Sequence, residues 1–159
     1  MKFSIKTISE KYLVGMNTKM SLAENKTRDL WRVLMPRRSE IRNRVDRLCY
    51  SMQIYNGLID FSKFTPSTIF TKWAAFEVEK FTDVPEGMET HILSGGEYAV
   101  FIHKGTPATF PQTMRYIFGE WLPSSKYKLD DREHFEILEE TNDRTDPNAE
   151  EEVWIPIRK

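Results

Sequence analysis

Cysteine is nearly absent from the sequence, and no long hydrophobic run occurs in it. Cys49 is the only cysteine among 159 residues, which excludes a disulfide framework and favours a reducing cytoplasm as the setting. The start, "MKFSIKTISEKYLVG", has no apolar segment of the kind that signals secretion, and no run of about 18 apolar residues follows. We therefore expect a cytoplasmic protein with no membrane partner.

An excess of charge of one sign and a metal-binding pattern are absent too. The formal net charge is −1, and the basic run at 36–47, "PRRSEIRNRVDR", is interrupted by Glu40 and Asp46 and contains no aromatic residue. We interpret this run as a solvated helix face and expect no direct nucleic-acid binding. His103 and His134 lack metal-ligand spacing, so we expect neither a metal nor a cofactor.

The sequence does contain a large apolar fraction. Hydrophobic residues make up 40% and aromatic residues 13%, enough to bury a sizeable core. We treat residues 1–159 as one domain with two halves, about 1–82 and 88–159, joined by the turn-forming "DVPEG" at 83–87.

Each half carries the same order of predicted elements. The first half predicts extended chain at 3–20, with a break at 9–11, and then a helix from Ser21 to Pro36. A second short helix at 39–48 and two strands, at 50–56 and 69–81, follow. The second half predicts two strands at 88–105, separated by Gly95-Gly96, and a helix at 110–123. A strand at 134–140, a polar loop at 141–152 and a final strand at 153–157 follow.

The repeated order strand–helix–strand–strand, with a period of about 86 residues, indicates an internal duplication. It predicts an α+β fold of duplicated β-α-β-β halves that form antiparallel sheets, with helices on one side and a central groove about a pseudo-twofold axis. If helices cover one face of each sheet, the other faces line that groove, where pockets are favoured.

One strand carries a carboxylate in an apolar setting. In "REHFEILEE", Glu136 stands between Phe135 and Ile137, and because alternate side chains of a strand share a face it groups with His134. A solvated surface charge and a charge that faces a ligand are both open interpretations, since buried unpaired carboxylates are rare. The predicted groove favours the second and leaves Phe135 and Ile137 to pack under the helices.

Four stretches, taken in order, resemble the GyrI-like family, also described as AraC-type effector-binding domains: "NKTRDLWRVLMPRRSEIRN" (25–43), "GEYAVFIHKGTP" (96–107), "IFGEWLPSSKYKLDDREHFEIL" (117–138) and "EEVWIPI" (151–157). The resemblance covers nearly the whole chain. It implies a bacterial domain of the multidrug-binding kind, with a central groove for small, often aromatic and cationic, molecules. In that family the glutamate of the "FE" strand motif faces the ligand, and Glu136 stands at the matching position.

Aromatic residues near the junction of the two halves are candidates for the walls of the site. They are Trp121, Trp73, Tyr98, Tyr55, Trp154 and Phe101. Aromatic walls stack on flat ligands and attract cations, and ordinary core packing is the alternative for each residue. Trp121 and Trp73 are the preferred candidates.

Three functions are compatible with these patterns. The first and preferred one is a stand-alone protein that senses or sequesters hydrophobic or cationic small molecules, with a link to transcription regulation or to drug and toxin resistance. The second, implied by hydrolase relatives in the family, is an enzyme that opens electrophilic strained rings with Glu136 as its general base. The third is binding of a protein partner through a sheet edge or the basic run.

Overall fold

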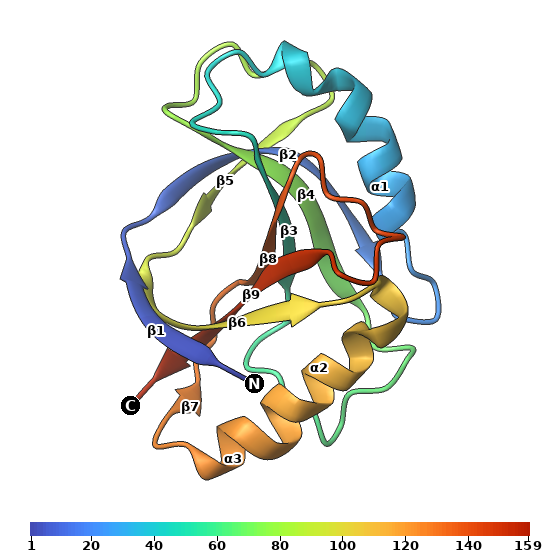
Figure 1. Cartoon of the computed structure of the whole chain (residues 1–159). Coiled ribbons are helices and arrows are strands. Elements are labelled where there is room, and N and C mark those ends of the chain that lie inside the picture. The colour runs from blue at the N-terminus through green and yellow to red at the C-terminus, as the bar shows by residue number, and fades with distance from the viewer.

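One curved antiparallel sheet and two principal helices, α1 and α2, form the computed structural model, which describes residues 1–159 (Figure 1). The strands are β1 (Phe3–Ile8), β2 (Lys11–Met20), β3 (Leu48–Ile54), β4 (Phe70–Val78), β5 (Glu89–Leu93), β6 (Gly96–Lys104), β7 (Lys128–Leu129), β8 (His134–Glu139) and β9 (Glu150–Arg158). The helical elements are α1 (Thr27–Leu34), η1 (Met35–Glu40), η2 (Pro107–Thr109), α2 (Phe110–Tyr116), the π-helical turn η3 (Ile117–Trp121) and α3 (Leu122–Ser124).

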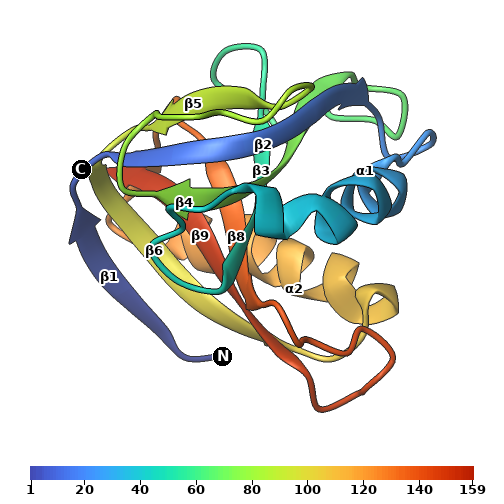
Figure 2. The ribbon, with the colours of Figure 1, turned by 90° about the horizontal axis from the view of Figure 1, so that it is seen from above.

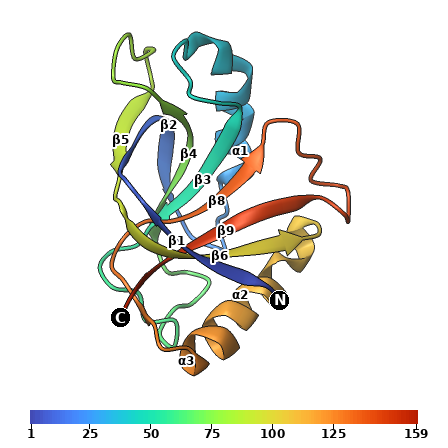
Figure 3. The same cartoon turned by 60° about the vertical axis from the view of Figure 1, so that its left-hand side comes forward.

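The strand order confirms the duplicated β-α-β-β plan. Strands follow one another as β1-β6-β9-β8-β3-β4-β2-β5, with β7 added on β9, so each half contributes three neighbouring strands and β3 pairs with β8 at the centre. The two halves also exchange their first strands. β1 precedes β2 in the chain but pairs with β6, while β5 precedes β6 but pairs with β2. Figure 3 shows this continuous sheet with β1 and β5 at its two ends.

The turns that lead into β2 and β6 pass close to each other. A Cβ atom on Gly95 would lie 2.8 Å from the backbone oxygen of Ile8 and 3.0 Å from the backbone nitrogen of Glu10. Only glycine fits at this approach, because a real Cβ atom does not come so near to backbone atoms. The exchange of edge strands therefore depends on a residue that the sequence supplies at the predicted turn.

The two faces of the sheet have different cores. Both helices lie on one face, here called the helix face, where α1 covers a cluster that includes Val14, Phe76 and Leu34 and α2 covers one that includes Phe101 and Ile155 (Figure 2). The opposite face, here called the inner face, is filled by strand residues alone. They are Leu13, Tyr50, Met52, Trp73, Ala75, Leu93, Tyr98, Val100, Phe135, Ile137 and Trp154. Both faces of the central strands are thus buried.

The predicted short helix at 39–48 is wrong. A 3₁₀ helix, η1, ends at Glu40, and the chain then turns and forms a single β-bridge between Arg44 and Val78 at the end of β4. The amide of Val45 donates to the carbonyl of Glu77, and the amide of Glu79 donates to the carbonyl of Asn43. The segment therefore satisfies its backbone groups by pairing with a strand, which sequence periodicity does not reveal.

The two longer predicted helices are both present in the structure, one of them with a later start. The helix predicted from 110 to 123 is present as α2, η3 and α3, and the helix predicted after Ser21 starts later, at Thr27. The Ser21 hydroxyl accepts a hydrogen bond from the amide of Glu24, so the predicted capping contact closes a turn ahead of the helix. None of these helices is both long and apolar enough to cross a membrane.

Replacing Phe135 by alanine should destabilise the protein by about 3–5 kcal/mol, because its ring is completely buried in the inner-face core. Phe81→Ala is the matched control. The Phe81 ring is 37% exposed, and its loss should cost about 1 kcal/mol or less. Urea unfolding followed by circular dichroism measures both. Equal losses for the two variants would contradict the assignment of Phe135 to a closed core.

Candidate functional site

Strand β8 places Glu136 at the centre of the helix face. β8 lies between β3 and β9, and Glu136 is aligned with Ser51 on one side and Val153 on the other. The residue is only 7% exposed, so it is not a solvated surface charge. Phe135 and Ile137 project to the inner face, which corrects the expectation that they pack under the helices.

Two side chains from neighbouring strands hold the Glu136 carboxylate. The Nε2 amide of Gln53 on β3 donates to Oε1 at 3.0 Å, and the Nζ of Lys72 on β4 lies 3.7 Å from the same oxygen. No protein group donates a hydrogen bond to the other oxygen, Oε2. Because a buried carboxylate requires a partner, the Lys72 ammonium serves as its internal counter-ion.

Lys72 is itself buried, with 4% of its surface exposed. Burial lowers the pKa of its ammonium, while the negative charges of Glu136 and Glu151 act in the opposite direction. The cross-strand alignment of Lys72 with Gln53 brings both side chains to the carboxylate from the same side. The two carboxylates therefore offset part of the effect that burial has on the pKa of Lys72.

A second buried carboxylate, Glu151 on β9, lies near this pair. Burial and then the charge of Glu136 raise the pKa of Glu151 to about 7, while Arg144 and Lys72 act in the opposite direction. Arg144 Nη1 lies 3.4 Å from Glu151 Oε1 at the edge of the site, and its side chain is 40% exposed. Two buried carboxylates thus share one buried ammonium, with a further cation at the rim.

Aromatic rings close the site on the side of β3 where the segment 55–69 leaves the sheet. The ring of Tyr55 lies edge-on to His134 at 4.9 Å between centroids, and the charge of Glu136 contributes to the raised pKa of Tyr55. Across from it, Phe61 packs on Phe118 of η3 at 4.0 Å between centroids. Phe64 and Phe70 complete this group, at 6.1 and 5.3 Å from Tyr55.

His134 is the one buried histidine whose Nδ1 has no partner. It is 3% exposed, and its ring lies between Tyr55 and Phe118. Burial lowers its pKa to about 3, so the imidazole is neutral at physiological pH. His134 is therefore shielded from solvent, with Tyr55 at the start of the segment 55–69 packed against it.

Only Tyr55, among the predicted aromatic walls, lies beside Glu136 and His134. Trp73, Tyr98 and Trp154 project to the inner face, on the other side of the sheet from the carboxylate. Trp73 packs beside His91, and the rings of Tyr98 and Trp154 each contact Phe135. These three residues build the core, so we leave them out of the proposed site.

Trp121 and Phe101 lie on the helix face but in the cluster under α2. Their rings meet edge-on at 5.0 Å between centroids, and Phe3 of β1 covers Trp121 at the same distance. This packing anchors α2 and the edge strand, and we do not assign either residue to the site. Sequence reasoning missed Lys72, although a lysine within the apolar strand "FTKWAAF" was an available signal.

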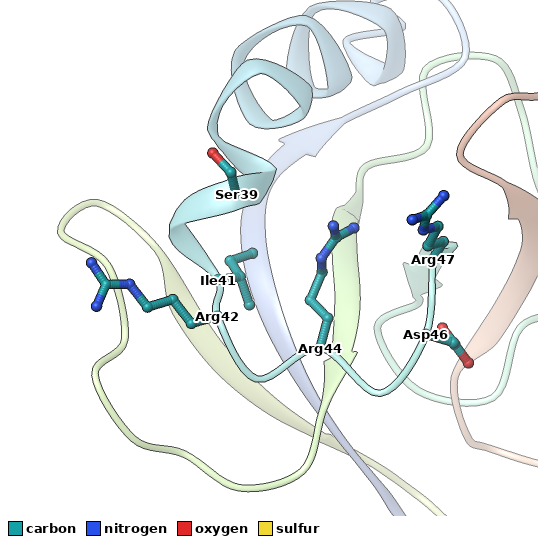
Figure 4. Close-up of a pocket in the computed structure, with 6 residues that line it drawn as sticks. All are labelled: Ser39, Ile41, Arg42, Arg44, Asp46 and Arg47. Carbon is teal, nitrogen blue, oxygen red and sulfur yellow. The ribbon is translucent and has the colours of Figure 1, made fainter.

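The basic run is distinct from this site. A surface cavity of about 480 Å³ lies here. Figure 4 shows the residues that line it, which are Ser39, Ile41, Arg42, Arg44, Asp46 and Arg47. Arg38 and Arg44 both pair with Glu140, and Arg37 bonds to Glu40. Much of the positive charge is therefore neutralised within the chain, and the run forms a 3₁₀ helix and a turn in place of the expected solvated helix face.

The chain belongs to the family of GyrI-like small molecule binding domains, whose model matches residues 1–158. The transcriptional regulator BrlR of Pseudomonas aeruginosa is 28% identical over 146 residues, which cover 91% of this chain and 51% of that protein. The chain thus spans about half the length of this relative. The family predicted from the four sequence stretches is confirmed.

Two solved structures share the fold at low sequence identity. SAV2435 bound to tetraphenylphosphonium has a TM-score of 0.70 and 14% identity, covering 99% of this chain and 94% of that one. A hydrolase encoded by lin2189 from Listeria innocua has a TM-score of 0.63 and 10% identity, covering 99% and 92%. At such identities the likeness concerns the fold.

Replacing Glu151 by glutamine should make the protein more stable than the wild type at pH 8 by an amount that shrinks at pH 5. The folded pKa of about 7 lies above the ordinary 4.5, so the stabilisation from the bound proton is complete below about pH 4.5 and is lost as the pH rises through about 7. Between pH 5 and 8 the variant should gain on the order of 2 kcal/mol over the wild type.

Urea unfolding at several pH values checks this dependence. Glu150→Gln, at the exposed neighbouring position, is the control and should follow the wild type at each pH. A pH-independent difference between Glu151→Gln and the wild type would show that Glu151 titrates normally.

Proposed function

We propose that this protein binds small aromatic cations on the helix face, with Glu136 as the anionic anchor, and that it serves as a sensor or a sequestering module. The observation that carries the proposal is a buried carboxylate with one free oxygen, next to a group of aromatic rings. The same small-molecule specificity would link it to transcription regulation or to drug and toxin resistance. Direct contact with nucleic acid has no part in the proposal.

The charge of the site supports a cationic ligand. Glu136 and Glu151 are both buried, while Lys72 is the only ammonium buried with them. A positive ligand beside Oε2 would take the place of Lys72 as the counter-ion of Glu136, since buried charges require compensation. The ligand would then compete with Lys72 for the same carboxylate.

The aromatic rings support a flat or multi-ring ligand. Tyr55, Phe61, Phe64 and Phe118 offer faces and edges, and a cation over a ring gains roughly 0.5–2 kcal/mol. Phe61 packs directly on Phe118, so the ligand would enter by separating these two rings. The lipophilic cation bound to SAV2435 belongs to the class of ligand that such a site favours.

Glu136 and Lys72 should have opposite effects on the affinity for tetraphenylphosphonium. Glu136→Gln removes the anchoring charge and should weaken binding about tenfold or more, whereas Lys72→Met removes the competing ammonium and should strengthen binding about tenfold. Isothermal titration calorimetry measures both. Glu139→Gln and Lys80→Met alter exposed residues of the same two chain regions and should leave the affinity unchanged.

Stability measurements complete this test. Lys72→Met leaves a buried carboxylate without its counter-ion and should lower the unfolding free energy by about 3–5 kcal/mol, and saturating ligand should restore much of it. Unchanged affinity in Glu136→Gln would refute the anchoring role of Glu136.

Hydrolysis of an electrophilic ring is the second candidate function. It is favoured by the free oxygen of Glu136, which lies on the same face of β8 as the neutral imidazole of His134, because either group could accept a proton from water. Incubation with an aromatic epoxide, followed by mass spectrometry, distinguishes the two functions. The binding function predicts no product above the uncatalysed rate. Product that disappears in Glu136→Gln would favour the hydrolase.

A further inference from the structure

The helix face contains a buried polar atom without a partner, on the same face as the Glu136 carboxylate. Nδ1 of His134 is buried without a hydrogen-bond partner, although the residue is only 3% exposed. Most buried polar atoms are paired, because an unpaired one has lost its hydrogen bonds to water without replacement. Such an atom in a site built to bind a small molecule points to a polar group on the ligand.

Nδ1 of His134 and Oε2 of Glu136, which receives no hydrogen bond from the protein, lie on one face of one strand. His134 and Glu136 are alternate residues of β8, and each contacts or influences the same ring, Tyr55. Oε2 of the carboxylate accepts hydrogen bonds only, and a neutral imidazole offers one nitrogen as an acceptor. The free hydrogen-bond acceptors on this face therefore suit a ligand that donates hydrogen bonds and also carries a positive charge.

We infer that the site selects protonated amines that retain at least one N–H over permanently quaternary cations of the same shape, with His134 as the residue that makes the distinction. This inference rests on the proposed function and specifies its ligand class. A quaternary ion gives its charge to Glu136 but leaves His134 Nδ1 without a partner. A protonated amine compensates the charge and donates its N–H.

A matched pair of probes tests the inference. Naphthylmethyl-dimethylammonium carries one N–H, and in naphthylmethyl-trimethylammonium a methyl group takes its place. The wild type should bind the first at least tenfold more tightly by calorimetry. His134→Phe keeps an aromatic ring but removes the nitrogen, and it should bind both probes with equal affinity.

Each outcome decides a different question. Equal binding of the two probes by the wild type would overturn the inference while leaving the cation site intact. A preference that persists in His134→Phe would overturn the role of His134. Failure of both probes and of tetraphenylphosphonium to bind would overturn the proposed function and the inference with it.

A measurement on the wild type covers the case in which His134→Phe does not fold. ¹⁵N NMR of the imidazole reports hydrogen bonding at each ring nitrogen. The Nδ1 resonance of His134 should shift on addition of the tertiary amine and remain in place with the quaternary one. Equal shifts with both probes would contradict the inference.

Discussion

The alternation of side chains along β8 is the constraint on which the rest of this structure depends. Pairing with β3 and β9 fixes the strand on both sides, so Phe135 and Ile137 fill the inner face while His134 and Glu136 face the helices. A slip of one residue would bury the carboxylate among the inner-face aromatic rings and expose the aromatic side chains to the charged face. The duplicated fold supplies this fixed position, because β3 and β8 meet where the two halves join.

A charge held at that position must be compensated, and the chain does this with its own residues. Lys72 provides the positive charge, Gln53 donates a hydrogen bond, and Phe61 packs on Phe118 in the group of aromatic rings that includes Tyr55. In the structure these groups occupy the surroundings that a cationic ligand would need. Binding would then be an exchange, in which the ligand replaces an internal ion pair and an internal aromatic contact. Its affinity would reflect the free energy of the new contacts minus that of the internal contacts that are lost.

Sequence patterns were sufficient for the order of the elements and for the family, but they were insufficient for the faces of the sheet. The strand–helix–strand–strand repeat appears in the structure, whereas the exchange of β1 and β5 depends on pairing between distant segments. Alternation separated Glu136 from Phe135 correctly, yet both faces of β8 are apolar enough to be core, so sequence did not identify the face that the helices cover. Some of the aromatic candidates, such as Trp73, therefore lie on the inner face, on the other side of the sheet from Glu136. Lys72 and the segment 55–69 enter the site only through tertiary packing.

A crystal structure of the protein with a bound naphthylmethyl-dimethylammonium ion tests the central claim most directly. The account predicts the ligand on the helix face, with its N–H donated to His134 Nδ1, its positive charge beside Glu136 Oε2, its rings among Tyr55 and Phe118, and Lys72 moved away from Oε1. A ligand bound on the inner face beside Trp73 and Tyr98, or one bound elsewhere with the Glu136–Lys72 pair unchanged, would contradict it.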